Sequence, residues 1–152
     1  MSIRQATAAD LPRILELGAQ LHAESPRWSR IPFSVDRAGR TMANLLESPD
    51  GTIFVSEADG RVTGGIAGMI QQHWASDAIV AHEVSFFISK DCRGGMAACR
   101  LICALDAWAQ IRGAAWLTVG TSTGVDPELT ARLYESLGFT RCAIGLERVY
   151  GN

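Results

Sequence analysis

The sequence contains almost no lysine and has no excess of positive charge. Lys90 is the only lysine among 14 basic residues, and the formal net charge is −2. Nucleic-acid-binding domains carry a basic patch or stripe, so we expect no nucleic acid partner. A Walker-type phosphate loop needs a lysine after its glycines. Gly64, Gly65 and Gly68 are not followed by one and lie inside a strand-like segment, where close packing or a bulge is expected instead.

Cysteines are few and lack the spacing of a metal site. None of the four, Cys92, Cys99, Cys103 and Cys142, belongs to a CxxC pair or a cluster with histidine, so we expect no metal. Residues 1–5 lack the apolar stretch of an export signal. The apolar runs are far shorter than the roughly 20 residues of a membrane-spanning helix. We therefore expect a cytoplasmic protein with free thiols and no membrane partner.

What the sequence does contain is typical of one globular domain. Its 152 residues are 47% hydrophobic and 20% charged, which argues against disorder. A chain of this length buries most of its apolar surface without disulfide or metal cross-links. No linker, repeat or low-complexity tract interrupts it, so we expect a single domain over residues 1–152.

The order of periodic segments predicts an α/β (α+β) fold. Alternating apolar residues and turn signals predict strands over residues 2–6, 52–58, 61–72, 79–89, 114–120 and 139–150. Helical spacing and end signals predict helices over residues 7–25, 35–47, 94–112 and 127–137. This order gives about four helices packed on a mixed, largely antiparallel central sheet of six strands, or seven with a final hairpin.

The junction between the fourth predicted strand and the third predicted helix is the most informative stretch. Over residues 88–98 a strand ends, two glycines and several small residues follow, and an amphipathic helix begins at once. The first turn of a helix has unpaired backbone N–H groups and a partial positive charge. Small residues let an anion approach these groups closely, so we predict a backbone cradle for a diphosphate-sized anion.

Two motifs, at residues 93–98 and 133–139, carry a family resemblance. Residues 93–98 (Arg-Gly-Gly-Met-Ala-Ala) resemble the acyl-CoA motif Arg/Gln-x-x-Gly-x-Gly/Ala of the GNAT superfamily of N-acetyltransferases, except that Met96 replaces the middle glycine. Residues 133–139 (Leu-Tyr-Glu-Ser-Leu-Gly-Phe) are similar to the late helix of that family and its glycine–phenylalanine exit. The asparagine often found seven residues before the tyrosine is replaced by Pro127.

The resemblance implies a fold, a co-substrate and a set of site residues. It implies a GNAT-like sheet with a splayed strand pair at the CoA site, acetyl-CoA as co-substrate, and a small-molecule or peptide amine as acceptor. Tyr134 would donate its proton to the leaving CoA thiolate. Homodimers are common in the family, so a homodimer is one expected state. The residues implied to bind the cofactor are Phe87, Ile88, Ser89, Arg93, Gly94, Gly95, Met96, Ala97 and Ala98.

Acetyl transfer to an amine also needs a base, because most amines are protonated at neutral pH and must lose a proton before they attack. We favour Glu83, since several members of the family use a glutamate on this strand. Regular alternation would place Glu83 on the face opposite Val84, Phe86 and Ile88.

Other interpretations of these residues stay open. Glu83 is equally interpreted as a solvated or arginine-paired carboxylate, and Tyr134 as a packed aromatic residue. His82 and His73 are alternative bases with a suitable pKa. Proximity and desolvation alone are sufficient for many such reactions, so an essential base is not required.

The acceptor should approach from the side of the first two helices. Candidate lining residues there are Trp28, Arg30, Phe33 and Trp74. The expected function is therefore acetyl-CoA-dependent N-acetylation of a primary amine by direct attack. The alternative is a catalytically degenerate acyl-CoA-binding sensor or structural protein, which Met96 and the missing asparagine keep open.

Overall fold

The computed structural model describes residues 1–151 and contains one five-stranded sheet whose strands follow chain order, β1-β2-β3-β4-β5. The first four strands are mutually antiparallel, whereas β5 is parallel to β4. The strands are β1 (Ser2–Gln5), β2 (Gly51–Ala58), β3 (Arg61–Gln72), β4 (Ile79–Ile88) and β5 (Leu117–Thr118). The helices are α1 (Leu11–Glu24), α2 (Val35–Glu47), α3 (Ala97–Ile111) and α4 (Pro127–Ser136), with short 3-10 turns at Ala8–Asp10, Trp28–Arg30 and Lys90–Cys92.

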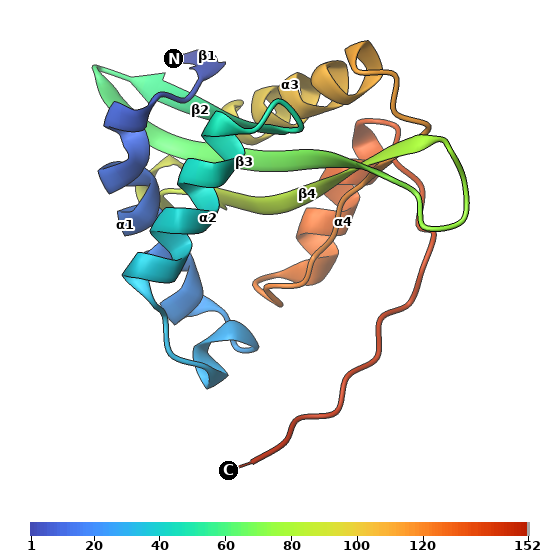
Figure 1. Ribbon diagram of the computed structural model, residues 1–152. Helices are drawn as coiled ribbons and strands as arrows, with labels where there is room; N and C mark the ends of the chain where they lie inside the picture. Colours follow the sequence, from blue (N-terminus) through green and yellow to red (C-terminus); the bar gives the residue numbers. More distant parts are fainter. Residues whose placement is uncertain (152) are drawn as a thin grey trace.

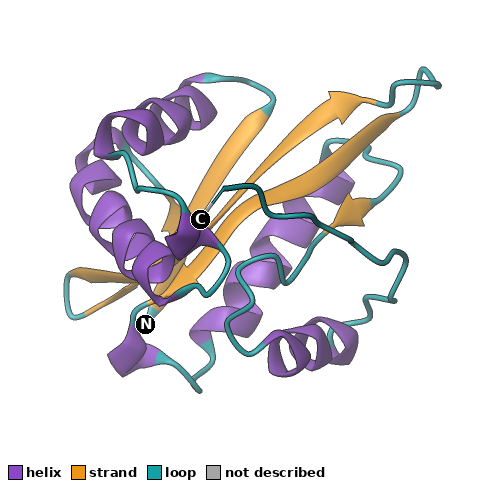
Figure 2. Ribbon diagram, turned by 90° about the horizontal axis from the view of Figure 1, so that it is seen from below, coloured by secondary structure: helices purple, strands orange, loops and turns teal. Residues whose placement is uncertain are grey.

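Helices cover both faces of the sheet, with α1 and α2 on one face and α3 and α4 on the other (Figures 1 and 2). The α1–α2 layer buries Leu17 and Leu45 against sheet residues such as Val55. The α3–α4 layer buries Leu101 and Ile66, both of which are 0% exposed. The expected mixed α/β architecture with four helices is therefore confirmed. No helix within residues 1–151 has the length and apolar character needed to cross a membrane.

The glycines of β3 allow the layers to approach the sheet closely. A Cβ atom added at Gly65 would lie 2.6 Å from the ring of Phe87, and one added at Gly68 would lie 2.5 Å from Cδ1 of Leu105. Both distances are well inside van der Waals contact, so any side chain would displace these neighbours. The expected close packing of these glycines is confirmed.

A β-bulge in β4 changes which face each residue occupies. The β3–β4 register shifts between Ala67 and Gly68, which leaves Val84 as an extra residue in β4. Val84 packs in the α1–α2 layer, whereas Phe86 packs in the α3–α4 layer and Glu83 reaches α4. The expected alternation, with Val84 and Phe86 together and Glu83 opposite, is wrong because the bulge inserts one residue into a period of two.

The carboxyl-terminal segment also differs from the prediction. The strand expected over residues 139–150 does not form, and every residue from 140 to 151 is exposed along a segment that leaves the sheet (Figure 1). The strand expected over residues 114–120 is reduced to Leu117–Thr118. A strand requires a hydrogen-bonded neighbour, and within the described chain residues 140–151 have no backbone partner. The sheet therefore has five strands instead of six or seven.

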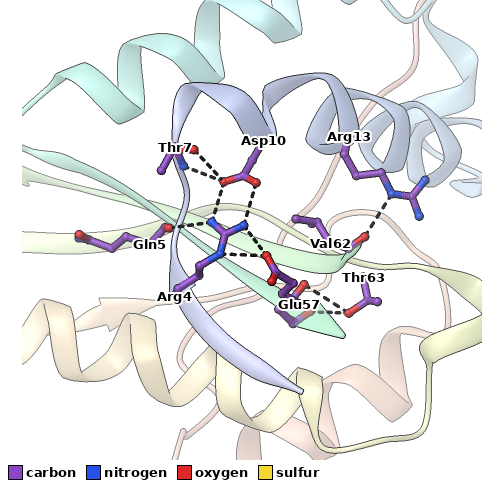
Figure 3. A network of polar contacts seen from close by, with 9 residues as sticks. Arg4, Gln5, Thr7, Asp10, Arg13, Glu57, Val62 and Thr63 are labelled. Atoms are coloured by element: carbon purple, nitrogen blue, oxygen red, sulfur yellow. Dashed lines mark hydrogen bonds and ion pairs between the residues drawn. The ribbon is translucent and has the colours of Figure 1, made fainter. Parts of the chain in front are cut away.

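A charged network joins β1, β2 and the start of α1 (Figure 3). The guanidinium of Arg4 donates to both carboxylate oxygens of Asp10, at 2.8 and 3.0 Å, and to Glu57 at 2.6 and 3.1 Å. Asp10 also accepts the backbone N–H of Thr7 at 2.8 Å. These bonds from Arg4 and Thr7 outweigh burial and lower the pKa of Asp10 to about 2.

Candidate active site

The site begins where β4 and β5 separate. The two strands pair only at Ala81↔Leu117 and His82↔Thr118. Glu83 is the first residue of β4 beyond the last of these pairs, so it lies at the point where the strands diverge. The family resemblance implies a splayed strand pair at the CoA site, and the end of the β4–β5 pairing at His82 is the point where it would begin.

Glu83 contacts Tyr134 of α4 across this opening. The hydroxyl of Tyr134, a residue that is only 3% exposed, donates a hydrogen bond to Oε2 of Glu83. The Tyr134 ring packs edge-on against Phe139, with centroids 5.4 Å apart. The chain can make this contact because Gly138 ends α4 at φ +97°, a conformation that favours glycine. The glycine–phenylalanine exit predicted from the sequence thus fixes the tyrosine ring.

The environment of the pair shifts both pKa values upward. Burial raises the pKa of Glu83 to about 7, and the hydrogen bond from Tyr134 only partly opposes this rise. Burial, together with the adjacent Glu83 carboxylate, raises the pKa of Tyr134, so its phenol stays protonated at neutral pH. The pair can therefore offer a base that titrates near neutrality and an acid that holds its proton.

The turn between β4 and α3 presents unpaired backbone amides. Residues 93–96 are all exposed, and Gly94 has φ +84°. Helix α3 begins at Ala97 instead of the predicted Gly94, and Met96 at its cap position provides no side-chain hydrogen bond. Within the described chain, no hydrogen bond to a protein acceptor uses the amides of residues 93–98. This turn has the geometry of an anion cradle made by backbone.

Arg93 does not point freely into that cradle. Its guanidinium donates to both carboxylate oxygens of Glu24 at the end of α1, at 2.6 and 2.8 Å, and its Nε donates to the carbonyl of Ile88 at 3.2 Å. The ion pair lowers the pKa of Glu24. Arg93 therefore fastens the turn to α1, a role that the sequence alone did not suggest.

The remaining residues of the predicted CoA-binding set lie at the end of β4 and at the start of α3. Phe87 and Ser89 are buried, at 3% and 6% exposure, and Ile88 packs in the α3–α4 layer. The backbone N–H of Ser89 bonds to the carbonyl of Thr63 at 2.8 Å. Ala97 is buried and Ala98 half-buried in the first turn of α3. The structure thus brings these residues together along one strand end and one helix start.

The predicted acceptor residues do not all lie together. Trp28 and Phe33 line an apolar cavity of about 200 Å³ between α1, α2 and β4, with Val84 and Ser85 from the bulge. Arg30 lies outside this cavity and pairs with Glu147 at 3.6 Å. Trp74 also lies outside it, 92% exposed in the β3–β4 connection. The grouping of all four residues into one acceptor surface is therefore wrong.

The alternative bases, His73 and His82, take no part in the hydrogen bond between Glu83 and Tyr134. His73 is in the β3–β4 connection, its ring 5.7 Å from that of Trp116. His82 is within the paired part of β4, opposite Thr118. Neither histidine has a hydrogen bond to Glu83 or Tyr134 in the described chain. No group of three or more His, Cys, Asp or Glu side chains suited to a metal ion occurs in residues 1–151.

A second cavity, of about 740 Å³, lies between the residues that continue β5, helix α4 and the carboxyl-terminal segment. One wall is formed by residues 118–122, which continue from β5, and the floor includes Tyr134 and Ala131 of α4. The opposite wall consists of the carboxyl-terminal segment, from Phe139 to Glu147. Sequence reasoning missed this groove because it assigned both walls to paired strands.

Comparison with solved structures identifies the same fold in chains of nearly equal length. A transcriptional regulator from Bacillus halodurans C-125 has a TM-score of 0.79 at 18% identity, covering 98% of this chain and 99% of its own. The aminoglycoside 6'-N-acetyltransferase AAC(6')-IG from Acinetobacter haemolyticus has a TM-score of 0.76 at 17% identity, covering 100% and 99%. The aminoglycoside N-acetyltransferase AAC(6')-Iy, in complex with CoA, has a TM-score of 0.78 at 20% identity, covering 98% and 93%.

The sequence itself matches a known family. Comparison with curated protein sequences gives no significant match. In contrast, residues 49–141, more than half of the chain, match the profile described as acetyltransferase (GNAT) domain. This match covers β2 to β5, the cradle, α3 and α4, and so includes both Glu83 and Tyr134. The chain therefore belongs to the GNAT family of acetyltransferases, and the enzyme class expected from its two motifs, N-acetyltransferase, is confirmed.

Proposed function

We propose that this protein transfers the acetyl group of acetyl-CoA to a primary amine by direct attack, with Glu83 as base and Tyr134 as acid. The observation that carries the proposal is the hydrogen bond between these two side chains at the point where β4 and β5 separate. A base with a pKa of about 7 and a phenol with a raised pKa are the two groups that this reaction needs.

The co-substrate fits the strand end and the helix start. The amides of residues 93–98 would hold its diphosphate, since they are unpaired and the turn is exposed. Phe87, Ile88 and Ser89 would flank the pantetheine arm. Met96, which departs from the family motif, is 60% exposed and leaves the cradle open. AAC(6')-Iy has been solved with CoA and with a bisubstrate analogue, which supports CoA as the ligand of this fold.

The two side chains would move one proton from nitrogen to sulfur. As the nitrogen of a neutral amine attacks the thioester carbonyl, its surplus proton passes to Glu83. The carbon–sulfur bond breaks, and Tyr134 gives its proton to the thiolate. Glu83, hydrogen-bonded to Tyr134, returns the proton to the phenol. Each group is thus restored to its starting state.

The acceptor is a small-molecule or peptide amine. Solved structures with this fold include aminoglycoside N-acetyltransferases, but also a chain described as a transcriptional regulator. Such a likeness indicates the fold and does not select a substrate. The apolar cavity beside Val84 and Ser85 would take an uncharged part of an acceptor more readily than a cationic sugar, since it is lined mainly by apolar side chains.

A panel of amines, assayed by release of free CoA thiol, tests the proposal. We expect acetyl-CoA to bind and at least one amine to release thiol, with release abolished or strongly reduced in Glu83→Gln. Binding of acetyl-CoA without release for any amine would support the sensor alternative. A chain that does not bind acetyl-CoA by calorimetry would contradict both.

A further inference from the structure

The apolar cavity between α1, α2 and β4 offers no charged partner to a cation. The described residues that line it are apolar or aromatic apart from His22, Thr41 and Ser85, and none of them is Asp, Glu, Lys or Arg. A cationic group that leaves water for an apolar site without a partner is strongly disfavoured. The part of an acceptor that enters this cavity is therefore uncharged, so the cavity does not suit an acceptor with several ammonium groups.

The volume of the cavity indicates the size of that uncharged part. The cavity measures about 200 Å³, and a dry apolar cavity of about 150 Å³ in another protein is large enough to bind benzene. One six-membered ring, or a branched alkyl group of similar size, therefore fits. A methyl group would leave most of the cavity unfilled and would bury much less apolar surface.

One wall of the cavity is aromatic and is held in place by hydrogen bonds. The His22 ring lies 5.3 Å from that of Phe33 and 6.4 Å from that of Trp28, measured between centroids. Nε2 of His22 donates to the carbonyl of Ile31 at 2.7 Å. The backbone N–H of Trp28 donates to the hydroxyl of Ser25, a fully buried residue, at 2.9 Å. Such a preformed wall binds an apolar group with little further loss of conformational freedom.

Gly18, in the middle of α1, lines the same cavity without a steric need for glycine. A Cβ atom added there would meet no atom of the described chain within 4 Å, and the φ of Gly18 is not in the left-handed region. Glycine inside a helix is less favourable than alanine. The missing side chain therefore relieves neither a close contact nor a strained backbone, and its effect is to enlarge the cavity.

The cavity lies beside the part of β4 that carries the proposed base. The bulge places two consecutive residues, Val84 and Ser85, in its wall, and both follow Glu83 directly. Strand β5 pairs with β4 only as far as His82, so within residues 1–151 no strand covers this edge of β4 beyond that point. An amine joined to a group in the cavity can therefore reach Glu83 around the open edge.

We propose that the acceptor is a primary monoamine whose apolar end is about the size of one benzene ring, and that Gly18 determines this size by leaving room for the ring. The proposal rests on the function proposed above, because it names the acceptor of that same site. The ring lies against Trp28 and Phe33, and the amine lies at the edge of β4 near Glu83. This acceptor differs in charge from the aminoglycosides on which enzymes of the same fold act.

Binding of a ring that carries no amine tests the cavity apart from turnover. Without acetyl-CoA, benzyl alcohol should shift the methyl NMR signal of Met42, which lines the cavity, and leave that of Met96, in the turn before α3, unchanged. Gly18→Leu should weaken this binding by about tenfold or more, because an isobutyl group at residue 18 would occupy the space of the ring. Its melting temperature should not fall, since leucine is a better helix former than glycine.

Gly39→Ala is the matched control and should bind benzyl alcohol as wild type does. Gly39 is also a glycine within a helix, α2, but it does not line the cavity. A Cβ atom there would meet only Cδ1 of Leu15, at an ordinary 3.5 Å.

Turnover tests the size and charge of the acceptor. In wild type, kcat/KM for benzylamine should exceed that for methylamine by about tenfold or more. Gly18→Leu should remove this difference and leave the value for methylamine unchanged. An aminoglycoside should release CoA thiol no faster than methylamine does.

The outcomes separate this proposal from the function on which it rests. If benzyl alcohol shifts Met42 but no amine of any kind is acetylated, the function proposed above fails and the ring site is confirmed. If amines are acetylated but Met42 does not shift, or Gly18→Leu lowers kcat/KM equally for methylamine and benzylamine, the proposal is overturned. Faster release of thiol with an aminoglycoside than with benzylamine would also overturn it.

Discussion

The Tyr134 hydroxyl donates a hydrogen bond to the Glu83 carboxylate, although 51 residues separate them in sequence. The bond joins the acid and the base of the proposed reaction directly. It also ties α4 to the point where β4 and β5 separate. Changing either residue should therefore alter both the protonation of its partner and the rate of acetyl transfer.

Tyr134→Phe should lower kcat by about 10²-fold or more, which is the usual contribution of a positioned acid or base. The KM for acetyl-CoA should change little, because the cradle at residues 93–98 is untouched. Loss of the donor should also raise the pKa of Glu83, since the hydrogen bond lowers it, and move the acid limb of the pH–rate profile to higher pH. Tyr150→Phe, at the only other tyrosine, is the control and should behave as wild type. If the variant keeps the wild-type kcat, the proton for the CoA thiolate comes from water instead of Tyr134.

Glu83→Gln should remove the acid limb of kcat/KM that wild type shows near pH 7. Below this pH the carboxyl is protonated and cannot accept a proton from the amine, because burial holds its pKa at about 7. The profile is measured with one amine for both proteins, so any limb due to the amine itself remains. Persistence of an unchanged limb near pH 7 in the variant would show that Glu83 is not the base.

Glu83 should also make the fold less stable as the pH rises. Its folded-state pKa of about 7 exceeds the value of about 4.3 for an unfolded chain, so between these values the folded state binds more protons. The free energy of unfolding should fall over this window by up to about 3 kcal/mol, in proportion to the shift. Urea unfolding at pH 5 and pH 8 should show this loss in wild type and in the exposed control Glu16→Gln, but not in Glu83→Gln. An equal loss of unfolding free energy between pH 5 and pH 8 in all three proteins would show that burial does not raise the pKa of Glu83.

Gly95→Glu should place a carboxylate at the amide cradle and weaken binding of acetyl-CoA by more than about tenfold, or about 1.4 kcal/mol. The variant should fold, because a Cβ atom at residue 95 would contact nothing closer than the carbonyl oxygen of Cys92, at 3.8 Å. Gly95→Gln is the control of equal size without charge and should bind more tightly than the glutamate variant. Calorimetry measures both affinities. If the glutamate variant binds as wild type does, the diphosphate lies elsewhere.

Asp10→Asn should lower the free energy of unfolding at pH 7 by about 2 kcal/mol, because the pKa of Asp10 falls from 3.8 to about 2 on folding. A lowered pKa means that this stability is present above pH 4 and lost as the pH falls toward 2. The difference between wild type and variant in urea unfolding should therefore shrink between pH 7 and pH 3. Asp59→Asn, exposed in the β2–β3 turn, should show no such difference.

Much of the fold could be predicted from the sequence, because the local signals for helices and their ends agree with the folded structure. Predicted helices over residues 35–47 and 127–137 differ from α2 and α4 by at most one residue. The motif at residues 133–139 predicted correctly that the helix ends at Gly138, because a glycine helix stop acts locally. The catalytic role of Tyr134 stays a prediction. Predictions from local pattern fail where the deciding contact is distant in sequence.

Three features in and around the site could not be predicted from local sequence patterns. The bulge at Val84 depends on pairing with β3 and leaves no mark on the alternation of β4. The ion pair of Arg93 with Glu24 joins residues that are 69 positions apart in sequence. The segment at residues 140–151 has strand periodicity, but periodicity does not reveal whether a neighbour is available in the same chain.

The bulge in β4 decides which side of the sheet Glu83 faces. Glu83 pairs with Gly68 and Ser85 pairs with Ala67, so deletion of Val84 would make these two pairs consecutive and leave Glu83 on the side of Tyr134. A relative without the bulge would reach the same arrangement with one residue fewer in this strand. An alignment that runs through β4 without a gap at Val84 would therefore equate positions on opposite sides of the sheet and misassign the proton acceptor in such a relative.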